Sequence, residues 1–378
     1  MSLTRIIIGK LHRQWITYMM SFRYGRWTLR RVLVGSLGLS FLGIGIFAFY
    51  SIVFTLELLP WNPRVNMWCD TEKVPEYMLQ AAPDEMTVVT MFIDLGVFKK
   101  GEQPLAYHSP YKYKRWMRTF GKMVNRVVAY IENEEDIEYF KKIRSCLPPS
   151  HTKVIKIHRE ELPSFKYLAQ IKSIYSLPSY PKYHPNTVYP EYSCAMHAKY
   201  DVLQRSCIMD FFNTPYIAWV DIGLFRSLDG TDYPLFKLVP PDKFNPERVG
   251  FSQAWPQDPV FTPEFVLKNK LVWVSGSMVL ATKEYMLNFT RDYKEAVNEL
   301  LDQGLSNTDQ EVIYAMYSAK MRKAHYVKIK TYLCHPGQLG LFGPASRYFC
   351  LGYVCKNAWD KRVPHIRNKI SGVARDHR

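Results

Sequence analysis

The chain has 378 residues, of which 47% are hydrophobic and 15% aromatic, and its formal charge is +16. This composition excludes a disordered chain, a collagen and a small disulfide-rich protein, and the length suffices for one large domain or two ordinary ones. Seven basic and no acidic residues precede residue 32, which leaves 43 basic and 34 acidic residues for the remainder. Because that surplus is modest, we do not expect a nucleic-acid-binding protein.

The first predicted element is a membrane-spanning helix. Val32–Leu56 is a run of 25 residues without a charge, whereas about 20 apolar residues suffice to cross a bilayer. A cleaved signal peptide has a shorter apolar core, of about 7 to 15 residues. Since the basic residues precede the run and Glu57 follows it, the positive-inside rule places residues 1–31 in the cytoplasm. We therefore predict a single-pass type II protein of the Golgi or endoplasmic reticulum membrane, with a lumenal C-terminal domain.

The chain after the span divides into three predicted segments. Residues 57–86 hold four prolines and no sustained periodicity, which is typical of a stem. Residues 87–358 carry the elements of a folded domain, and residues 359–378 are predicted to form a basic tail, with a strap across the domain as the alternative. All seven cysteines follow the span, in a compartment that permits disulfides, but their spacing does not fix the pairing. The one N-glycosylation acceptor is Asn288.

Short apolar runs alternate with helical patterns inside the predicted domain. Runs of strand type lie at residues 87–93, 126–131, 153–157, 216–220 and 271–282. Helical spacing or capping signals lie at residues 110–120, 134–145, 196–211 and 289–300, and from Thr308 onward, with Gly304 as a helix stop. This alternation predicts an α/β fold with a mixed, mainly parallel sheet flanked by helices on both faces.

Polar residues lie where this sheet would bind a ligand, because ligands of open α/β sheets bind beyond the carboxyl ends of strands. The candidate sites are Asp94 with Gly96, Asp221 with Gly223, and Ser275-Gly276-Ser277. A carboxylate beside glycine can hold a divalent cation or a ribose hydroxyl, since glycine lets a phosphate or sugar approach the backbone. The alternative for each site is a turn without a ligand.

Three segments carry a resemblance to a known family: residues 87–96 (TVVTMFIDLG), residues 108–117 (HSPYKYKRWM) and the block from Tyr192 to Arg226. They resemble the HtrL/YibB-like family, which is associated with glycosyltransferase activity and a GT-A-like, Rossmann-like fold. The resemblance covers roughly residues 87–344. It implies a nucleotide-sugar donor and a glycan, glycolipid or protein acceptor.

The predicted donor-binding residues are Asp94, Gly96, Lys199, Gly223, Ser275 and Gly276, and residues 275–277 are also predicted to line the acceptor side. Lys199, on the predicted helix before Asp221, can reach diphosphate oxygens where that helix faces the cleft, and His197 is its neighbour there. The alternative for Lys199 is a solvated helix edge, because it lies beside the apolar stripe of that helix.

Asp221 and Asp309 are the candidate catalytic residues. Asp309 is the candidate general base, which must lie within hydrogen-bond reach of an acceptor hydroxyl. The alternative for Asp309 is structural, because Thr308 to Glu311 also has the pattern of a capping box, with Glu311 at its third helical position.

The resemblance makes Asp221 and His335 candidate ligands of Mn²⁺ or Mg²⁺. Gly223 stands where such enzymes often have a second aspartate, so the need for a metal is left open.

Several further residues have two interpretations. Trp219 and Trp273 lie in apolar runs and are predicted to be core, whereas Trp255 is a candidate for stacking on a sugar. Lys112, Lys114 and Arg115 would attract an anionic substrate or form a solvated helix face.

The rival hypothesis to an enzyme is a non-catalytic binding or scaffold protein on the same fold, motivated by the incomplete Asp-x-Gly motif at Asp221. A third hypothesis is a carbohydrate-binding receptor at the cell surface.

Overall fold

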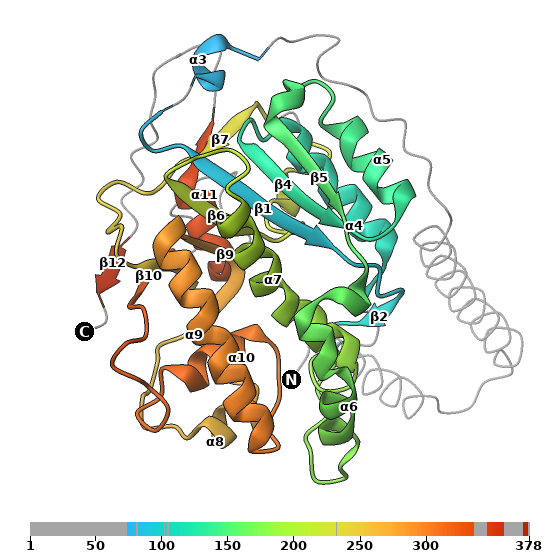
Figure 1. Ribbon diagram of the computed structural model, residues 1–378, viewed down its shortest axis with the longest axis vertical. Coiled ribbons are helices and arrows are strands. Elements are labelled where there is room, and N and C mark those ends of the chain that lie inside the picture. The colour runs from blue at the N-terminus through green and yellow to red at the C-terminus, as the bar shows by residue number, and fades with distance from the viewer. Residues whose placement is uncertain are drawn as a thin grey trace, which may run out of the picture. The chain divides into compact units, whose positions relative to one another are not determined.

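A computed structural model describes residues 74–80, 82–101, 103, 106–231, 233–335, 346–358 and 373–376 (Figure 1). The predicted cytoplasmic tail, the predicted membrane span and most of the predicted stem lie outside these residues. Among the helices that are described, none is both long and apolar enough to cross a bilayer.

An eight-stranded sheet forms the centre of the domain, with the strand order β12-β10-β8-β9-β6-β1-β4-β5. Its strands are β1 (Met86–Phe92), β4 (Arg126–Ile131), β5 (Thr152–Lys156), β6 (Tyr216–Val220), β8 (Val249–Gln253), β9 (Val274–Thr282), β10 (Ile329–Leu333) and β12 (Val373–Asp376). Only β9 and β12 run against the direction of the other strands. The predicted mixed, mainly parallel sheet is therefore confirmed.

Helices cover both faces of this sheet. They are α3 (Glu76–Leu79), α4 (Pro110–Met117), α5 (Glu134–Ile143), α6 (Leu168–Ser176), α7 (Pro190–Met209), α8 (Pro263–Lys268), α9 (Lys283–Asp302), α10 (Asp309–Met316) and α11 (Cys350–Cys355). Side chains of α6, α7, α9 and α10 share one apolar cluster, and those of α4, α5 and α11 share another. Figure 1 shows α7 crossing in front of the sheet, with α9 and α10 on the same side.

The sequence of β1 explains why helices cover both faces. Val88 lies in the cluster with α4 and α5, and Val89 lies in the cluster with α7 and α9, and both are fully buried. A strand whose side chains alternate between two covered faces has a mainly apolar sequence, as β1 does.

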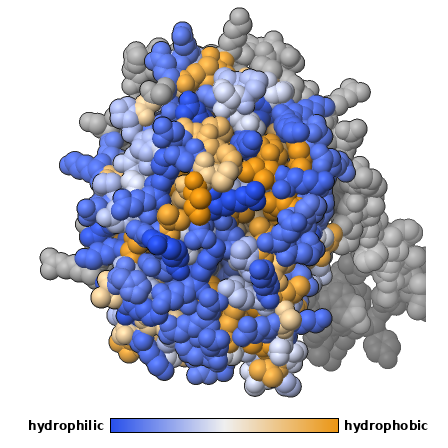
Figure 2. Space-filling model, in the orientation of Figure 1, coloured by the Kyte–Doolittle hydropathy of each residue, from blue (hydrophilic) through white to orange (hydrophobic). Residues whose placement is uncertain are grey.

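Outside the core, the face seen in Figure 2 is mainly hydrophilic, with apolar patches between polar side chains.

The predicted boundaries hold closely for the first four strand runs and differ elsewhere. Helices α7 and α9 begin at Pro190 and Lys283, before the residues whose spacing predicted them, and β8, β10, α6 and α8 were not predicted. Helix α7 ends at Met209, because Asp210 takes a left-handed conformation with φ of 43°, so the prediction that Phe211 belongs to this helix is wrong. Strand β9 begins at Val274, three residues after the predicted start. Gly304 has a φ of +69° after α9, and the predicted stop is confirmed.

Short two-stranded pieces complete the fold. The strands β2 (Phe98–Lys99) and β3 (Tyr107–His108) form a hairpin-like pair, and β7 (Phe236–Leu238) pairs with β11 (Lys356–Ala358).

Two ends of the described chain lie in segments predicted as stem and tail. Helix α3 lies within the predicted stem, and its Met78 packs with Val124, Leu147 and Leu235. Strand β12 lies within the predicted tail and pairs with β10. The segment boundaries themselves stay predictions.

Candidate functional site

A cavity of about 360 Å³ opens beyond the carboxyl ends of β1 and β6. The predicted site residues that line it are Asp94, Gly96, Lys199, Asp221, Gly223, Ser275 and Asp309. Ser277 lines it as well, whereas His335 is exposed after β10 and is not among the lining residues. The structure therefore brings the predicted donor-binding and catalytic residues together and leaves the second predicted metal ligand outside.

The sheet topology explains this convergence. Asp94 and Asp221 follow the ends of β1 and β6, which are parallel neighbours. Strand β9 runs antiparallel to β6, so that the backbone N–H of Asp221 donates to the carbonyl of Ser277 at 2.9 Å. Helix α10 packs on β9 and begins with Asp309. Residues far apart in sequence therefore meet at one edge of the sheet.

Lys199 joins the two candidate catalytic carboxylates. Its Nζ donates to Asp309 Oδ2 at 2.9 Å and to the carbonyl of Gly276 at 3.1 Å, and it lies 3.7 Å from Asp221 Oδ1. The side chains of Lys199 and Asp309 are only 2% and 1% exposed, whereas that of Asp221 is 38% exposed. We call Lys199, Asp221 and Asp309 the carboxylate–lysine cluster. Its burial excludes the solvated-edge interpretation of Lys199.

The cluster also explains the glycine in Ser275-Gly276-Ser277. A Cβ on Gly276 would lie 1.9 Å from Asp309 Oδ2 and 2.9 Å from Lys199 Nζ. Any larger residue would displace the ion pair. Gly276 therefore makes room for the cluster and does not itself line the cavity.

The electrostatics of the cluster favour its charged state. Burial by itself lowers the pKa of Lys199, but Asp221 and Asp309 outweigh it, and the net pKa lies above the usual value. Burial raises the pKa of Asp221, and the Lys199 ammonium opposes that shift. A buried ammonium between two carboxylates is stabilised as an ion.

The second oxygen of Asp309 has a different environment. Asp309 Oδ1 and the Tyr200 hydroxyl are both buried. Burial, followed by the charges of Asp309 and Asp221 and by the Asp309 side chain as a hydrogen-bond partner, raises the pKa of Tyr200 well above its usual value. Tyr200 therefore stays a neutral phenol beside the cluster.

Glu311 holds the start of α10 in an unexpected way. Its Oε2 accepts from the Thr308 hydroxyl at 2.6 Å, and its Oε1 accepts from Asn186 Nδ2 at 3.3 Å. The Thr308 side chain makes no capping bond to the helix backbone, so the predicted capping box is wrong in that form. Burial raises the pKa of Glu311 to about 7, against the opposing effect of the Thr308 hydrogen bond. The network fixes Asp309, two residues away.

The cavity also carries cations that the sequence analysis did not assign. Arg226 and Lys100 are exposed residues that line it. The Arg226 guanidinium lies 5.5 Å from the centre of the Trp116 ring and 4.8 Å from that of Phe349. Lys100 Nζ lies 5.5 Å from the centre of the Tyr192 ring. We call Lys100 and Arg226 the cationic wall.

His108 lies between these groups and stays neutral. Its ring is 5.9 Å from that of Phe98 and 5.5 Å from that of Trp116, measured between ring centres. Burial, together with the charges of Lys100, Lys112 and Arg226, lowers the pKa of His108 to about 3. The cationic wall is therefore lined by aromatic and neutral rings.

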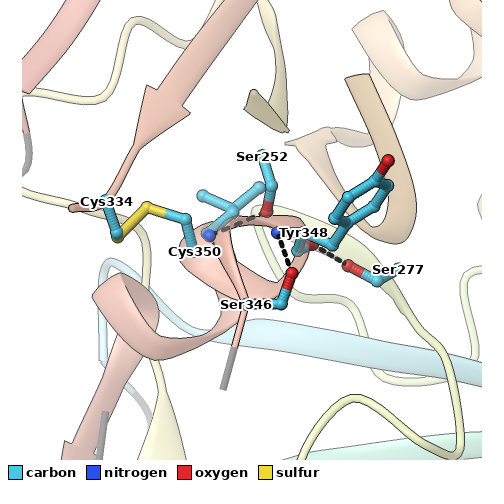
Figure 3. The surroundings of a disulfide bond; sticks show 7 residues. Ser252, Ser277, Cys334, Ser346, Tyr348 and Cys350 are labelled. Atoms are coloured by element: carbon cyan, nitrogen blue, oxygen red, sulfur yellow. Dashed lines mark hydrogen bonds between the residues drawn. A yellow bond between two sulfur atoms is a disulfide. The ribbon is translucent and has the colours of Figure 1, made fainter. Parts of the chain in front are cut away.

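A disulfide anchors the segment that carries Phe349, the ring next to Arg226. Cys334, after β10, is bonded to Cys350, the first residue of α11 (Figure 3). The segment before Cys350 supplies Ser346, Tyr348 and Phe349 to the cavity lining. Figure 3 also shows the Ser277 hydroxyl donating to the Tyr348 carbonyl, at 2.6 Å. Phe349, whose ring lies under Arg226, therefore belongs to a segment that is held by the disulfide at Cys350 and by a hydrogen bond from β9 to Tyr348.

The side chains at Asp221 do not fit a divalent-metal site. Hard cations need several converging oxygen ligands. Among the described residues, no three His, Cys, Asp or Glu side chains converge in this way. The two carboxylates nearest each other already surround the Lys199 ammonium, and a cation placed between them would be repelled by it. The predicted pairing of Asp221 with His335 as metal ligands is not supported by this geometry.

The remaining predicted residues lie in varied places. Trp219 and Trp273 are buried, as predicted, but Trp219 also lines the cavity and its Nε1 donates to Asp221 Oδ1 at 2.6 Å. Trp255 is 50% exposed and lies outside this cavity, with the Arg347 guanidinium 4.1 Å from its ring centre.

The predicted basic group on α4 is not part of the site. Lys112 Nζ donates to the Tyr107 carbonyl at 2.8 Å, Lys114 pairs with Asp136 at 2.8 Å, and Arg115 pairs with Asp229 at 3.2 Å. None of the three lines the cavity.

The predicted glycosylation residue Asn288 lies half-buried on α9, away from the cavity. Its modification stays a prediction.

Residues 84–236 match the HtrL_YibB family, described as bacterial proteins of unknown function. The resemblance inferred from the sequence is confirmed over that range, which holds Asp94, Lys199, Asp221 and both residues of the cationic wall. Ser275 and Asp309 lie beyond it.

The chain is also similar to solved structures of glycosyltransferases. The mouse xyloside xylosyltransferase 1 in its apo form is 14% identical, with a TM-score of 0.35, over 75% of this chain and 100% of that one. The core-mannan synthase A of Aspergillus fumigatus, in a Mn/GDP form, is 9% identical, with a TM-score of 0.35, over 68% of this chain and 77% of that one. No curated protein matches the chain.

Proposed function

We propose that the chain is a glycosyltransferase that moves a sugar from a nucleotide-sugar donor to a hydroxyl of a glycan, glycolipid or protein. The observation that carries this proposal is the carboxylate–lysine cluster at the end of the sheet, with exposed cations lining the same cavity. Such a cavity provides both a proton acceptor and positive charge for a phosphate-bearing donor. Asp94, Gly96 and Gly223 would lie against the donor, and Ser275 on the acceptor side.

Asp309 is the proposed general base. Lys199 holds its Oδ2, and Oδ1, which is buried in this structure, would take the proton of the acceptor hydroxyl once the site opens to admit it. The acceptor oxygen then bonds to the anomeric carbon, and the bond from that carbon to the diphosphate oxygen breaks. The nucleoside diphosphate leaves with the bonding electrons, and the proton stays on Asp309. Asp221, which is more exposed, would orient the sugar or its acceptor.

The test is release of nucleoside diphosphate by the purified full-length chain, in detergent, from UDP- and GDP-sugars with simple glycosides as acceptors. The account expects turnover with one donor class, and a loss of about 10²- to 10⁴-fold in Asp309→Asn. Asp229→Asn is the matched control, because Asp229 is also buried and ion-paired but lies outside the cavity. Unchanged turnover in Asp309→Asn would remove Asp309 from the mechanism, and absence of donor binding would remove the proposed function.

One observation favours the non-catalytic alternative. The Asp309 side chain is only 1% exposed and its charge is neutralised within the protein, as in a structural ion pair. Under that alternative the cavity binds a sugar nucleotide or glycan, and no donor is cleaved. Binding of a nucleotide sugar without release of its diphosphate would support it.

We further propose that the protein is anchored in the Golgi or endoplasmic reticulum membrane with its domain in the lumen. The uncharged run at residues 32–56, the basic flank before it and the Cys334–Cys350 disulfide support this location. In sealed microsomes the domain should resist added protease. Digestion of the domain without detergent would contradict the topology.

A further inference from the structure

The cavity offers a donor two kinds of positive charge. The Lys199 ammonium is buried and already serves two carboxylates. The cationic wall is exposed, and within the described residues neither Lys100 nor Arg226 forms an ion pair with a carboxylate. The wall is therefore available for an anion, whereas Lys199 is committed to holding the cluster.

Two other arginines near Arg226 differ from it in pairing. Arg115 and Arg118, on α4 and the turn after it, both pair with Asp229. Arg226 instead stacks between Trp116 and Phe349, with its guanidinium lining the cavity. Stacking fixes the plane of a guanidinium and leaves its N–H groups free to donate to phosphate oxygens in a forked geometry.

The position of Arg226 follows from its place in the chain. It begins the short helical turn at Arg226–Leu228, five residues after Asp221. Gly223 lies between them, and a Cβ there would lie 3.0 Å from the Trp116 ring. The same glycine therefore keeps the Trp116 ring in place beneath Arg226. The block Asp221-Ile-Gly223-x-x-Arg226 orients one carboxylate and one guanidinium toward a common cavity.

We propose that Arg226, assisted by Lys100, neutralises the diphosphate of the donor and takes the place of a divalent cation in this site. The inference rests on the proposed function, because it takes a sugar nucleotide as the ligand. It follows from two independent observations: the carboxylates surround an ammonium that disfavours a metal, and cations without an ion pair among the described residues line the same cavity. Nucleotide binding should therefore be independent of divalent metal.

The test is isothermal titration calorimetry of the full-length chain with UDP and with GDP, in excess EDTA and in excess MnCl₂. For the nucleotide that binds, the dissociation constants in the two buffers should agree within about threefold. Arg226→Gln should weaken binding by about tenfold to a hundredfold in both buffers, and Arg226→Lys should recover part of the loss. Arg291→Gln is the matched control, since Arg291 is an exposed arginine outside the cavity.

The outcomes separate this inference from the proposed function. Binding that requires MnCl₂ and is unchanged in Arg226→Gln would overturn the inference and leave a metal-dependent transferase. Binding in EDTA that is lost in Arg226→Gln supports it. Binding in EDTA that is unchanged in Arg226→Gln overturns the role of Arg226. If neither nucleotide binds in either buffer, the proposed function fails, and the inference fails with it. Thermal unfolding of each variant verifies that it is folded.

Discussion

The carboxylate–lysine cluster and the cationic wall line the same cavity but differ in burial and in pairing. In the cluster, Lys199 and Asp309 are almost fully buried and satisfy each other. In the wall, Arg226 and Lys100 are exposed and contact aromatic faces. The comparison shows that charged side chains have two roles in one site. Buried charges hold other residues in position, and exposed charges are available to bind a ligand.

This contrast makes the cluster the more sensitive of the two to mutation. Lys199→Met leaves two neighbouring carboxylates without their ammonium, one of them buried, and should lower the free energy of unfolding by about 3–5 kcal/mol. Urea denaturation of the full-length chain measures it. Lys268→Met is the control, because Lys268 pairs with the exposed Glu264 on α8 and should cost about 0–1 kcal/mol. Equal effects of the two variants would contradict a structural role for the cluster.

Removing the Cys334–Cys350 disulfide tests whether it holds the segment with Phe349 next to Arg226. Replacing Cys334 and Cys350 by serine releases a cross-link between residues 16 positions apart, which should lower the free energy of unfolding by about 3 kcal/mol. Because Phe349 lies under Arg226, nucleotide binding should weaken as well. Cys207→Ser, at a half-buried free cysteine, is the control. A double variant with normal stability and normal binding would show that the segment is held without the cross-link.

Glu311 gives the start of α10 a pH-dependent stability. Its folded pKa of about 7 lies above the usual 4.5, so the stability that its protonated form contributes is fully present below about pH 4.5 and is lost as the pH rises through about 7. Relative to Glu311→Gln, the native chain should therefore lose about 1–3 kcal/mol of unfolding free energy between pH 4.5 and pH 8. Urea denaturation of both proteins at the two pH values provides the difference. A difference that is constant with pH would exclude this titration.

Arg226 should show the smallest effect on stability. Since Arg226 is an exposed residue without an ion pair among the described residues, Arg226→Gln should change the free energy of unfolding by no more than about 0.5 kcal/mol, in contrast to its effect on nucleotide binding. Thermal unfolding measures the change in stability, and calorimetry of the same sample measures the change in nucleotide affinity. A large loss of stability would place Arg226 with the structural charges of the cluster.

Much of the fold could be predicted because its elements have strong local signals. The strand β4 has its predicted bounds, since the run at 126–131 is β-branched and apolar. Asp94, Asp221 and Ser275 could be placed in one site because strand ends meet at one edge of a sheet.

The rest of the site depends on tertiary contacts that no local pattern encodes. The burial of Lys199 required the packing of α7 against β9 and α10, and its spacing beside the apolar stripe gave two interpretations. Lys100 and Phe349 reach the cavity from the β2–β3 pair and from the segment before α11. Only Arg226 had a signal, since it follows Asp221 and Gly223 at short spacing in a motif already singled out.

The central claim is that a nucleoside diphosphate binds against the cationic wall, and hydrogen–deuterium exchange of the full-length chain tests it most directly. With the better-binding of UDP and GDP at saturation, exchange should slow in residues 219–226 and 346–351 and stay unchanged in α5. Protection elsewhere, or none at all with the nucleotide bound, would contradict the account.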